Sequence, residues 1–255
     1  MHITIENYYF NKSINNLINH MSKPKLLFFT GAGISAESGL QTFRDSKDGL
    51  WNNFKIEDVC TPAAWEKNPS LVLDFYNHRR KQCKEAKPNL AHELIAKLES
   101  QYDVTVVTQN VDNLHERAGS SKVIHLHGEL MKVRSTIDNS LIYIREDDIV
   151  LGDLCEKQSQ LRPHIVWFGE GLDNDLLDES IKEAMMCAVC VVVGTSLQVY
   201  PANSLPDFVP FGSQLIVIDP LINKMDFDEK RDIQFISKKA VDGMQMVFDS
   251  FSNIN

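Results

Sequence analysis

Four short apolar runs mark the chain, and each is followed directly by small or polar residues. The runs are KLLFFT before Gly31, VTVVT before Gln109, VCVVV before Gly194 and QLIVI before Asp219. Continuous apolar runs of this length, bounded by turn-forming residues, are typical of strands buried on both faces of a parallel sheet. The pattern therefore predicts four parallel strands.

Stretches with helical periodicity lie between these runs, among them AHELIAKLES and the segment 175–188. Alternating strands and helices with right-handed crossovers predict an α/β fold built on a doubly wound parallel sheet. Ligands of such sheets bind at the carboxyl ends of the strands. If the four strands are neighbours, the polar residues that follow them form one candidate site.

Two segments interrupt the alternation. The first, about 45–87, has a helical pattern and carries FYNHRRKQ on one helix, whereas the second, about 129–162, predicts a hairpin around STIDNSLIYI and an acidic loop, EDD. The second segment is too short to hold a core of its own, so we expect it to pack against its neighbours.

Composition narrows the function classes. The 255 residues carry a formal net charge of -9, which disfavours a nucleic-acid-binding surface because phosphate contacts need clustered Lys and Arg. The five cysteines have no disulfide-like spacing, and the first residues resemble neither a secretory signal nor a transit peptide. No apolar stretch approaches the roughly 18 residues that a membrane span needs. We expect a cytoplasmic protein with no membrane or nucleic-acid partner.

The segment from Gly31 to Ala36, GAGISA, fits the dinucleotide-binding pattern and directly follows a predicted strand. A tight structural turn explains the same glycines equally well. The acidic residue expected about 20 positions later, after a second strand, is missing, which disfavours a hydride-transfer dehydrogenase.

A second motif, QNVDN from Gln109 to Asn113, concentrates amide and carboxylate groups after a strand. It is either an Asn/Asp turn or a polar pocket for an amide and a ribose. His127 in HLHG has the near-neutral pKa of a general base, although most histidines are structural or solvated. Cys187 and Cys190 run into VVV, which favours core packing over metal or redox use, and without a second C-x-x-C no four-cysteine zinc site is encoded.

Taken in order, GAGISAESGLQTFR, TQNVDNLHERAG, HLHGEL, LRPHIVWFGE and GTSLQVYP closely resemble the sirtuin family of NAD-dependent protein deacylases, over about residues 25–220. The resemblance implies a Rossmann-like large domain and a smaller module formed by the two insertions, with NAD between them. The implied division is an N-terminal extension (1–24), the Rossmann-like NAD-binding domain (25–44, 88–128 and 163–255) and the small module (45–87 and 129–162).

The resemblance also implies roles for particular residues. The catalytic pair is His127, as general base, and Asn110. The residues that would bind NAD are Gly31, Ala32, Gly33, Ser35, Phe43, Arg44, Gln109, Asn110, Asp112, Gly194, Thr195, Ser196 and Asp219. The residues that would bind the substrate are Tyr76 and Arg79 at the acyl group and, by strand addition to the peptide, Val166, Trp167, Phe168 and Gly169.

The implied reaction begins with attack of the acyl oxygen on the nicotinamide ribose, which releases nicotinamide and leaves an imidate. His127 then activates a ribose hydroxyl, and the products are free lysine and O-acyl-ADP-ribose. Acyl-lysine proteins or peptides are therefore the expected partners. An NAD hydrolase or ADP-ribosyltransferase with the same nicotinamide pocket is the alternative, and a non-catalytic NAD sensor is disfavoured because His127 and Asn110 are both present.

The small module departs from the family pattern of two zinc-binding cysteine pairs. Arg134 is followed by Ser135, and the later region keeps only Cys155. We expect no zinc, and a module held by apolar residues such as Leu141, Ile142, Tyr143 and Ile144.

Tyr76 and Arg79 bear on which acyl group is removed. Their i, i+3 spacing places both on one helix face, and the pair resembles the one by which some sirtuins recognise succinyl- and malonyl-lysine. Cys60 falls where those members carry a small residue. The alternative is that Arg79 belongs to a solvated basic stretch with Arg80 and Lys81.

Overall fold

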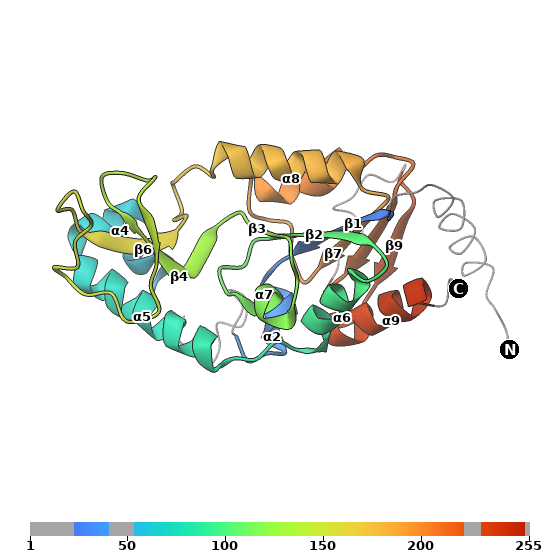
Figure 1. Cartoon of the computed structure of the whole chain (residues 1–255), viewed down its shortest axis with the longest axis horizontal. Helices are drawn as coiled ribbons and strands as arrows, with labels where there is room; N and C mark the ends of the chain where they lie inside the picture. The colour runs from blue at the N-terminus through green and yellow to red at the C-terminus, as the bar shows by residue number, and fades with distance from the viewer. Residues whose placement is uncertain (1–22, 41–53, 222–230, 253–255) are drawn as a thin grey trace, which may run out of the picture.

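Six parallel strands form the larger sheet of the computed structural model, which describes residues 23–40, 54–221 and 231–252 (Figure 1). Their order across the sheet is β3-β2-β1-β7-β8-β9. The strands are β1 (Lys25–Thr30), β2 (Asp103–Thr108), β3 (Val123–His125), β7 (Val189–Val193), β8 (Gln214–Ile218) and β9 (Ile233–Ile236). The four predicted strands are confirmed, and the structure places them next to one another, whereas the two short edge strands, β3 and β9, were not predicted.

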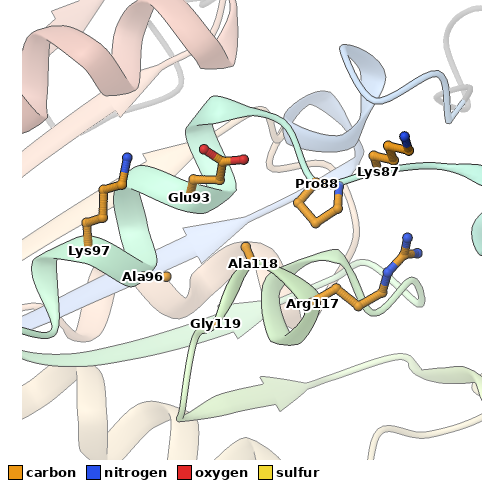
Figure 2. Close-up of a pocket in the computed structure, with 8 residues that line it drawn as sticks. All are labelled: Lys87, Pro88, Glu93, Ala96, Lys97, Arg117, Ala118 and Gly119. Atoms are coloured by element: carbon orange, nitrogen blue, oxygen red, sulfur yellow. The ribbon is translucent and has the colours of Figure 1, made fainter.

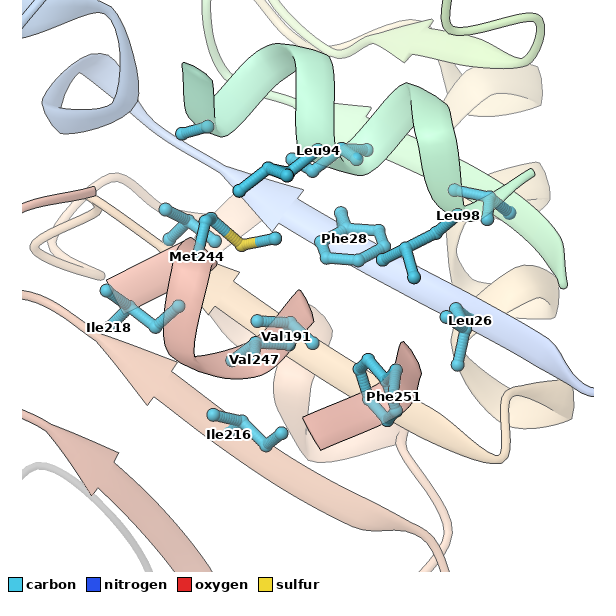
Figure 3. Packing of buried hydrophobic residues seen from close by; sticks show 14 of the residues in the cluster. Leu26, Phe28, Leu94, Leu98, Val191, Ile216, Ile218, Met244, Val247 and Phe251 are labelled. Carbon is cyan, nitrogen blue, oxygen red and sulfur yellow. The ribbon is translucent and has the colours of Figure 1, made fainter. Parts of the chain in front are cut away.

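Both faces of this sheet are buried. Along β1, Leu26 and Phe28 join one apolar cluster, and Leu27 and Phe29 join the cluster on the opposite face, because successive side chains of a strand point to opposite sides. Helices α6 (Leu90–Leu98) and α9 (Ala240–Ser252) cover the first face, as Figure 3 shows. Helix α8 (Asn174–Met186) and the 3-10 helix η2 (Ala202–Phe208) cover the second.

The C-x-x-C pattern belongs to this core. Cys187 and Cys190 are both buried free thiols on the α8 side of the sheet. Burial raises the pKa of Cys187 to about 12 and raises that of Cys190 well above its usual value. A thiol that stays protonated is a poor metal ligand and nucleophile, so the core interpretation is confirmed.

The small module combines helices of the first insertion with an antiparallel sheet of the second. The helices are α3 (Ile56–Val59), α4 (Pro62–Lys67) and α5 (Pro69–Glu85), and the sheet has the order β5-β4-β6, with β4 (Gly128–Ser135), β5 (Ile142–Ile144) and β6 (Leu161–Ile165). Helices α4 and α5 each begin with a proline preceded by a capping side chain, Thr61 or Asn68. The predicted hairpin is confirmed, since β4 and β5 pair with Val133 opposite Tyr143. The sheet reaches slightly beyond residues 129–162 at both ends.

The two insertions share a core, as expected. Leu73 of α5 packs with Val133, Ile149 and other residues of the second insertion. The expectation for β5 was half wrong: Leu141 and Tyr143 pack against this cluster, but Ile142 and Ile144 are 42% and 78% exposed. Strand β5 lies at the edge of the sheet, and its successive side chains point to opposite faces, so only every second side chain faces the core.

Two further short helices follow strands of the large sheet. Helix α2 (Ala32–Ala36) comes after β1, and helix α7 (Leu114–Ala118) comes after β2. No helix among the described residues is long and apolar enough to cross a bilayer.

Candidate active site

The loops that follow the four predicted strands meet at one edge of the sheet. The Gly31 N–H donates to the Val193 carbonyl at 3.0 Å, the Gln109 N–H to Thr30 at 2.9 Å, and the Gly194 N–H to Ile218 at 2.9 Å. Residues as far apart in the sequence as Gly31 and Val193 therefore lie side by side, because neighbouring parallel strands end together.

Two glycine loops touch backbone to backbone at this edge. The Gly33 N–H donates to the Gly194 carbonyl at 2.8 Å, and a Cβ on Gly33 would lie 2.6 Å from Gly194 Cα. Gly194 also has a φ of +61°, a backbone angle that residues with a side chain rarely adopt. Loop packing alone accounts for these glycines, so evidence for a dinucleotide has to come from the polar groups around them.

Asn110, Ser35 and Asp112 form a buried polar cluster between the loops. The Asn110 amide donates to the Gly31 carbonyl and to Ser35 Oγ, both at 3.1 Å, and Ser35 Oγ donates to Asp112 Oδ2 at 3.0 Å. Asn110 and Asp112 are each 7% exposed. Burial raises the pKa of Asp112, although hydrogen bonds from the Leu114 N–H and the Ser35 hydroxyl partly offset it.

The His127 ring is oriented by the same loop. Its Nδ1 lies 2.9 Å from the Gln109 carbonyl oxygen. A carbonyl oxygen only accepts, so Nδ1 carries the proton and Nε2 of the neutral ring carries the lone pair. Burial lowers the pKa of His127 despite the opposing effect of this hydrogen bond. The ring is therefore a neutral base near pH 7.

His125, two residues earlier, has the opposite charge state. Its ring nitrogens lie 2.9 Å from the Asn110 carbonyl and 2.6 Å from Glu116 Oε1. Burial opposes the charged ring, but the hydrogen bond and the charge of Glu116 outweigh it and raise the pKa of His125. The charged ring holds the main chain at Asn110. His125 belongs to the HLHG motif, but the sequence alone assigns it no role.

Asn89 is a second residue that the sequence analysis missed. It caps helix α6, and its amide donates to the Ile34 carbonyl at 2.8 Å and to Ser38 Oγ at 2.9 Å. Asn89 thereby connects the start of helix α6 to the segment that follows the glycine loop. Its only sequence signal is the N-cap pattern.

The remaining predicted NAD-binding residues have less extensive contacts. Gln109 Nε2 donates to Thr195 Oγ1 at 2.9 Å, and the Asp219 carboxylate accepts the Leu221 N–H at 2.8 Å in a turn after β8. Ala32 begins helix α2, and Ser196 is half-buried beside Thr195. Phe43 and Arg44 lie outside the described residues.

Tyr76 and Trp167 meet in the core of the small module. They are 5% and 2% exposed. The Trp167 indole N–H donates to the Tyr76 hydroxyl at 3.0 Å, and this hydroxyl donates to Cys60 Sγ at 3.5 Å. Burial raises the pKa of both Tyr76 and Cys60. Both groups therefore stay neutral near pH 7.

Arg79 is close enough to Tyr76, Cys60 and Asp112 to interact with them electrostatically. Burial lowers its pKa, and the negative charge of Asp112 opposes this shift. The alternative that groups it with a solvated Arg80 is wrong for Arg80. That side chain is 1% exposed, and its guanidinium donates to the carbonyls of Leu130, Arg145 and Asp147.

The predicted peptide-binding segment already uses three of its N–H groups. Val166 donates to the His127 carbonyl at 2.9 Å, Trp167 to Glu170 Oε2 at 2.9 Å, and Phe168 to the Cys60 carbonyl at 3.0 Å. At these three residues, a peptide would therefore pair with carbonyl oxygens rather than with N–H groups. The same bonds tie the segment to the loop of His127 and to the loop of Cys60.

The Sir2 family model matches residues 31–201. The chain belongs to the Sir2 family. It is similar to proteins named NAD-dependent protein deacylase from Helicobacter pylori, with 50% identity over 86% of this chain and 94% of the relative, and from Bacteroides thetaiotaomicron, with 46% identity over the same shares. A solved Sir2 homolog in complex with NAD is 38% identical and has a TM-score of 0.84, with 100% of this chain and 98% of that one covered.

The polar cluster of this Sir2 chain fits NAD. The amide of a carboxamide and the hydroxyls of a ribose donate hydrogen bonds, and the Asn110 side-chain oxygen and the Asp112 carboxylate are acceptors held together in one buried place by the bonds through Ser35. The fit therefore rests on the chemistry of this donor set rather than on the glycines.

No group of three or more His, Cys, Asp or Glu within the described part of this Sir2 chain could hold a metal ion. In the small module, near the positions where the family pattern has cysteine pairs, Cys155 Sγ instead donates to Ser135 Oγ at 3.4 Å. The absence of zinc stays a prediction.

A groove of about 630 Å³ lies elsewhere, over helices α6 and α7 (Figure 2). Its lining residues are Lys87, Pro88, Glu93, Ala96, Lys97, Arg117, Ala118 and Gly119. None of them is among the predicted site residues. This groove is separate from the candidate active site.

Proposed function

We propose that this chain is an NAD-dependent protein-lysine deacylase that transfers the acyl group to ADP-ribose. The observation that carries the proposal is the hydrogen bond from the Val166 N–H to the His127 carbonyl at 2.9 Å. It joins the base to the segment that would bind the peptide. The relatives named NAD-dependent protein deacylase and the solved NAD complex of a Sir2 homolog support the same activity.

The chain's own residues would hold NAD at the loop edge. They are Gly31, Ala32, Gly33, Ser35, Gln109, Asn110, Asp112, Gly194, Thr195, Ser196 and Asp219. When bound, NAD supplies an electrophilic ribose carbon and a ribose hydroxyl that accepts the acyl group. Asn110 and Asp112 sit in a fixed, buried network, so they would orient the nicotinamide half without reorganisation.

His127 would act as the general base. Its Nδ1 proton is committed to the Gln109 carbonyl, which leaves the Nε2 lone pair to accept a proton. The lowered pKa keeps the ring in its basic form at neutral pH. The charged His125 contributes indirectly, because it fixes the main chain of Asn110.

We further propose that the enzyme removes succinyl and malonyl groups as well as acetyl groups. The Tyr76 hydroxyl oxygen accepts a hydrogen bond from the Trp167 indole N–H. The hydroxyl proton therefore points away from Trp167, toward Cys60 Sγ. A thiol is a weak acceptor, and a carboxylate at the acyl terminus would be a stronger one. The nearby Arg79 charge supports a carboxylate at that place.

Incubation with NAD and acetyl-, succinyl- and malonyl-lysine peptides tests both proposals. Mass spectrometry should detect O-acyl-ADP-ribose in step with the free lysine peptide. ADP-ribose formed without deacylation would favour an NAD hydrolase, and ADP-ribose attached to protein would favour an ADP-ribosyltransferase. Removal of acetyl groups alone would contradict the wider acyl preference but not the deacylase function.

A further inference from the structure

The Glu170 carboxylate forms salt bridges with two arginines of the small sheet. Arg162 of β6 binds its two oxygens at 2.7 and 2.8 Å, and Arg134 of β4 binds Oε2 at 3.0 Å. The side chains of Arg162, Arg134 and Glu170 are 10%, 12% and 21% exposed. A bidentate, largely buried pair has a fixed geometry, unlike a single-contact surface ion pair.

This cluster fixes Trp167 in two ways. Glu170 Oε2 accepts the Trp167 main-chain N–H at 2.9 Å, and the Arg162 guanidinium lies 3.3 Å from the centre of the indole ring. The stacking is favourable because a cation over an indole face is attracted by the ring. The main chain is therefore held by Glu170 and the ring by Arg162, and these two charged groups are bound to each other.

Trp167 passes this constraint on to Tyr76. The indole N–H can only donate, so its 3.0 Å bond fixes which side of the Tyr76 hydroxyl remains a donor. Both arginines also donate to the Ile165 carbonyl, at 3.0 and 3.3 Å. The cluster thus holds the segment from Ile165 to Trp167 as one unit.

We propose that Glu170 and Arg162 are positioning residues for the acyl-lysine substrate, acting through Trp167 on the Tyr76 hydroxyl. The inference rests on the proposed deacylase function. If the ion pair had only a structural role, its loss would destabilise the module and would change the affinities for the acyl peptide and for NAD equally.

The salt bridge between Arg145 and Asp153 provides a matched control. It lies in the same module, joins Arg145 Nη2 to Asp153 Oδ2 at 2.9 Å, and has side chains 35% and 22% exposed. Asp153→Asn removes a charge of the same sign as Glu170→Gln does, at a place away from the Trp167 ring.

The experiment compares wild type, Glu170→Gln, Asp153→Asn, Tyr76→Phe and the double variant Glu170→Gln/Tyr76→Phe. The dissociation constants of a fluorescent succinyl-lysine peptide and of NAD are measured, together with Tm and, where turnover occurs, KM for each substrate. Glu170→Gln should weaken peptide binding at least about tenfold and NAD binding less than about twofold. Asp153→Asn should change neither. The double variant should bind the peptide within about twofold of the weaker single variant, because the two residues act in series.

Three results would overturn the inference: unchanged peptide affinity in Glu170→Gln, equal losses for peptide and NAD, or losses that multiply in the double variant. A wild-type protein that does not bind the acyl peptide also overturns it. A wild-type protein that binds the peptide but removes no acyl group contradicts the deacylase proposal alone, and the binding constants still decide the inference. If Glu170→Gln does not fold, Trp167→Phe removes the indole N–H and should weaken peptide binding in the same selective way.

Discussion

The large sheet and the small module are stabilised by different kinds of contact. Strands β1, β7 and β8 place apolar side chains on both faces, and most of them are fully buried. The module has apolar clusters too, but two of its central residues are the cations Arg80 and Arg162, which as whole residues are 1% and 8% exposed. These cations bind main-chain carbonyls and Glu170.

The difference separates two ways of specifying a structure. Apolar burial is non-directional and depends mainly on the area removed from water, so many apolar sequences could form the same sheet. Hydrogen bonds from a buried guanidinium need acceptors at defined positions. Arg80 meets carbonyls of residues 50 or more positions away. The module thus depends on particular residues, whereas the sheet depends on a pattern.

The largest expected effect lies where the two regions join, at His127 between β3 and β4. His127→Ala should lower kcat by about 10²–10⁴ because it removes the general base, with Tm and NAD affinity nearly unchanged. In the wild type, the acid limb of kcat/KM should fall at a pH below 6.5, because burial lowers the His127 pKa and the base form persists to lower pH. Near-normal turnover in a folded His127→Ala protein would remove the catalytic assignment.

The next effect concerns the sheet. Phe28→Ala should lower the free energy of unfolding by about 3–5 kcal/mol, because it leaves a cavity in a core that cannot fully collapse. Urea denaturation measures it. Phe28→Leu keeps most of the volume and serves as the control. A Phe28→Ala loss no larger than that of Phe28→Leu would contradict the tight packing of this core.

The module should respond differently at Arg80. Arg80→Met removes the charge-assisted hydrogen bonds to the carbonyls of Leu130, Arg145 and Asp147 and leaves the carbonyl of the buried Leu130 without this donor, so we expect a loss of about 3 kcal/mol. Limited proteolysis should then cut first near residues 145–148. The exposed neighbour Lys81→Met is the control, and similar small losses in both variants would show that the module does not depend on the buried cation.

A smaller effect is expected at the acyl site. Arg79→Met should lower kcat/KM for desuccinylation at least about thirty-fold, because losing one partner of a desolvated charge pair costs about 2 kcal/mol or more. Deacetylation should change much less. Steady-state kinetics with matched peptides measure both. Equal losses would assign Arg79 to the fold or to NAD binding.

The smallest expected effect is that of metal removal. Elemental analysis of the untagged protein should show far less than one zinc per chain, and dialysis against a chelator should leave Tm unchanged. Domains that depend on structural zinc unfold when it is removed. Stoichiometric zinc that resists dialysis would contradict a module held by its own side chains.

Much of the fold was predictable because the signal was local. The strands β1, β2, β7 and β8 were predicted from apolar runs alone, whereas their order as neighbours comes from the structure. The edge strands β3 and β9 span only Val123–His125 and Ile233–Ile236. Runs so short carry no periodicity that separates them from loops.

The candidate site was predictable only in part. Asn110, Asp112 and His127 could be named from their motifs, and the structure brings Asn110 and Asp112 together with Ser35. The partners that orient the motifs could not be named. The charged pair of His125 and Glu116, the Asn89 bridge and the grip on Glu170 are side-chain hydrogen bonds between segments with no shared pattern.

The sequence by itself determined the four central strands of the sheet, the covering helices α6 and α8 and the chemical groups at the carboxyl edge, because burial periodicity and turn chemistry act between near neighbours in the chain. Only the tertiary structure decided the charge states of His125 and His127, the burial of Arg80 and the link from Glu170 to Tyr76. Each of these depends on the distance to a partner and on exclusion from water. Both quantities exist only once distant segments have packed together.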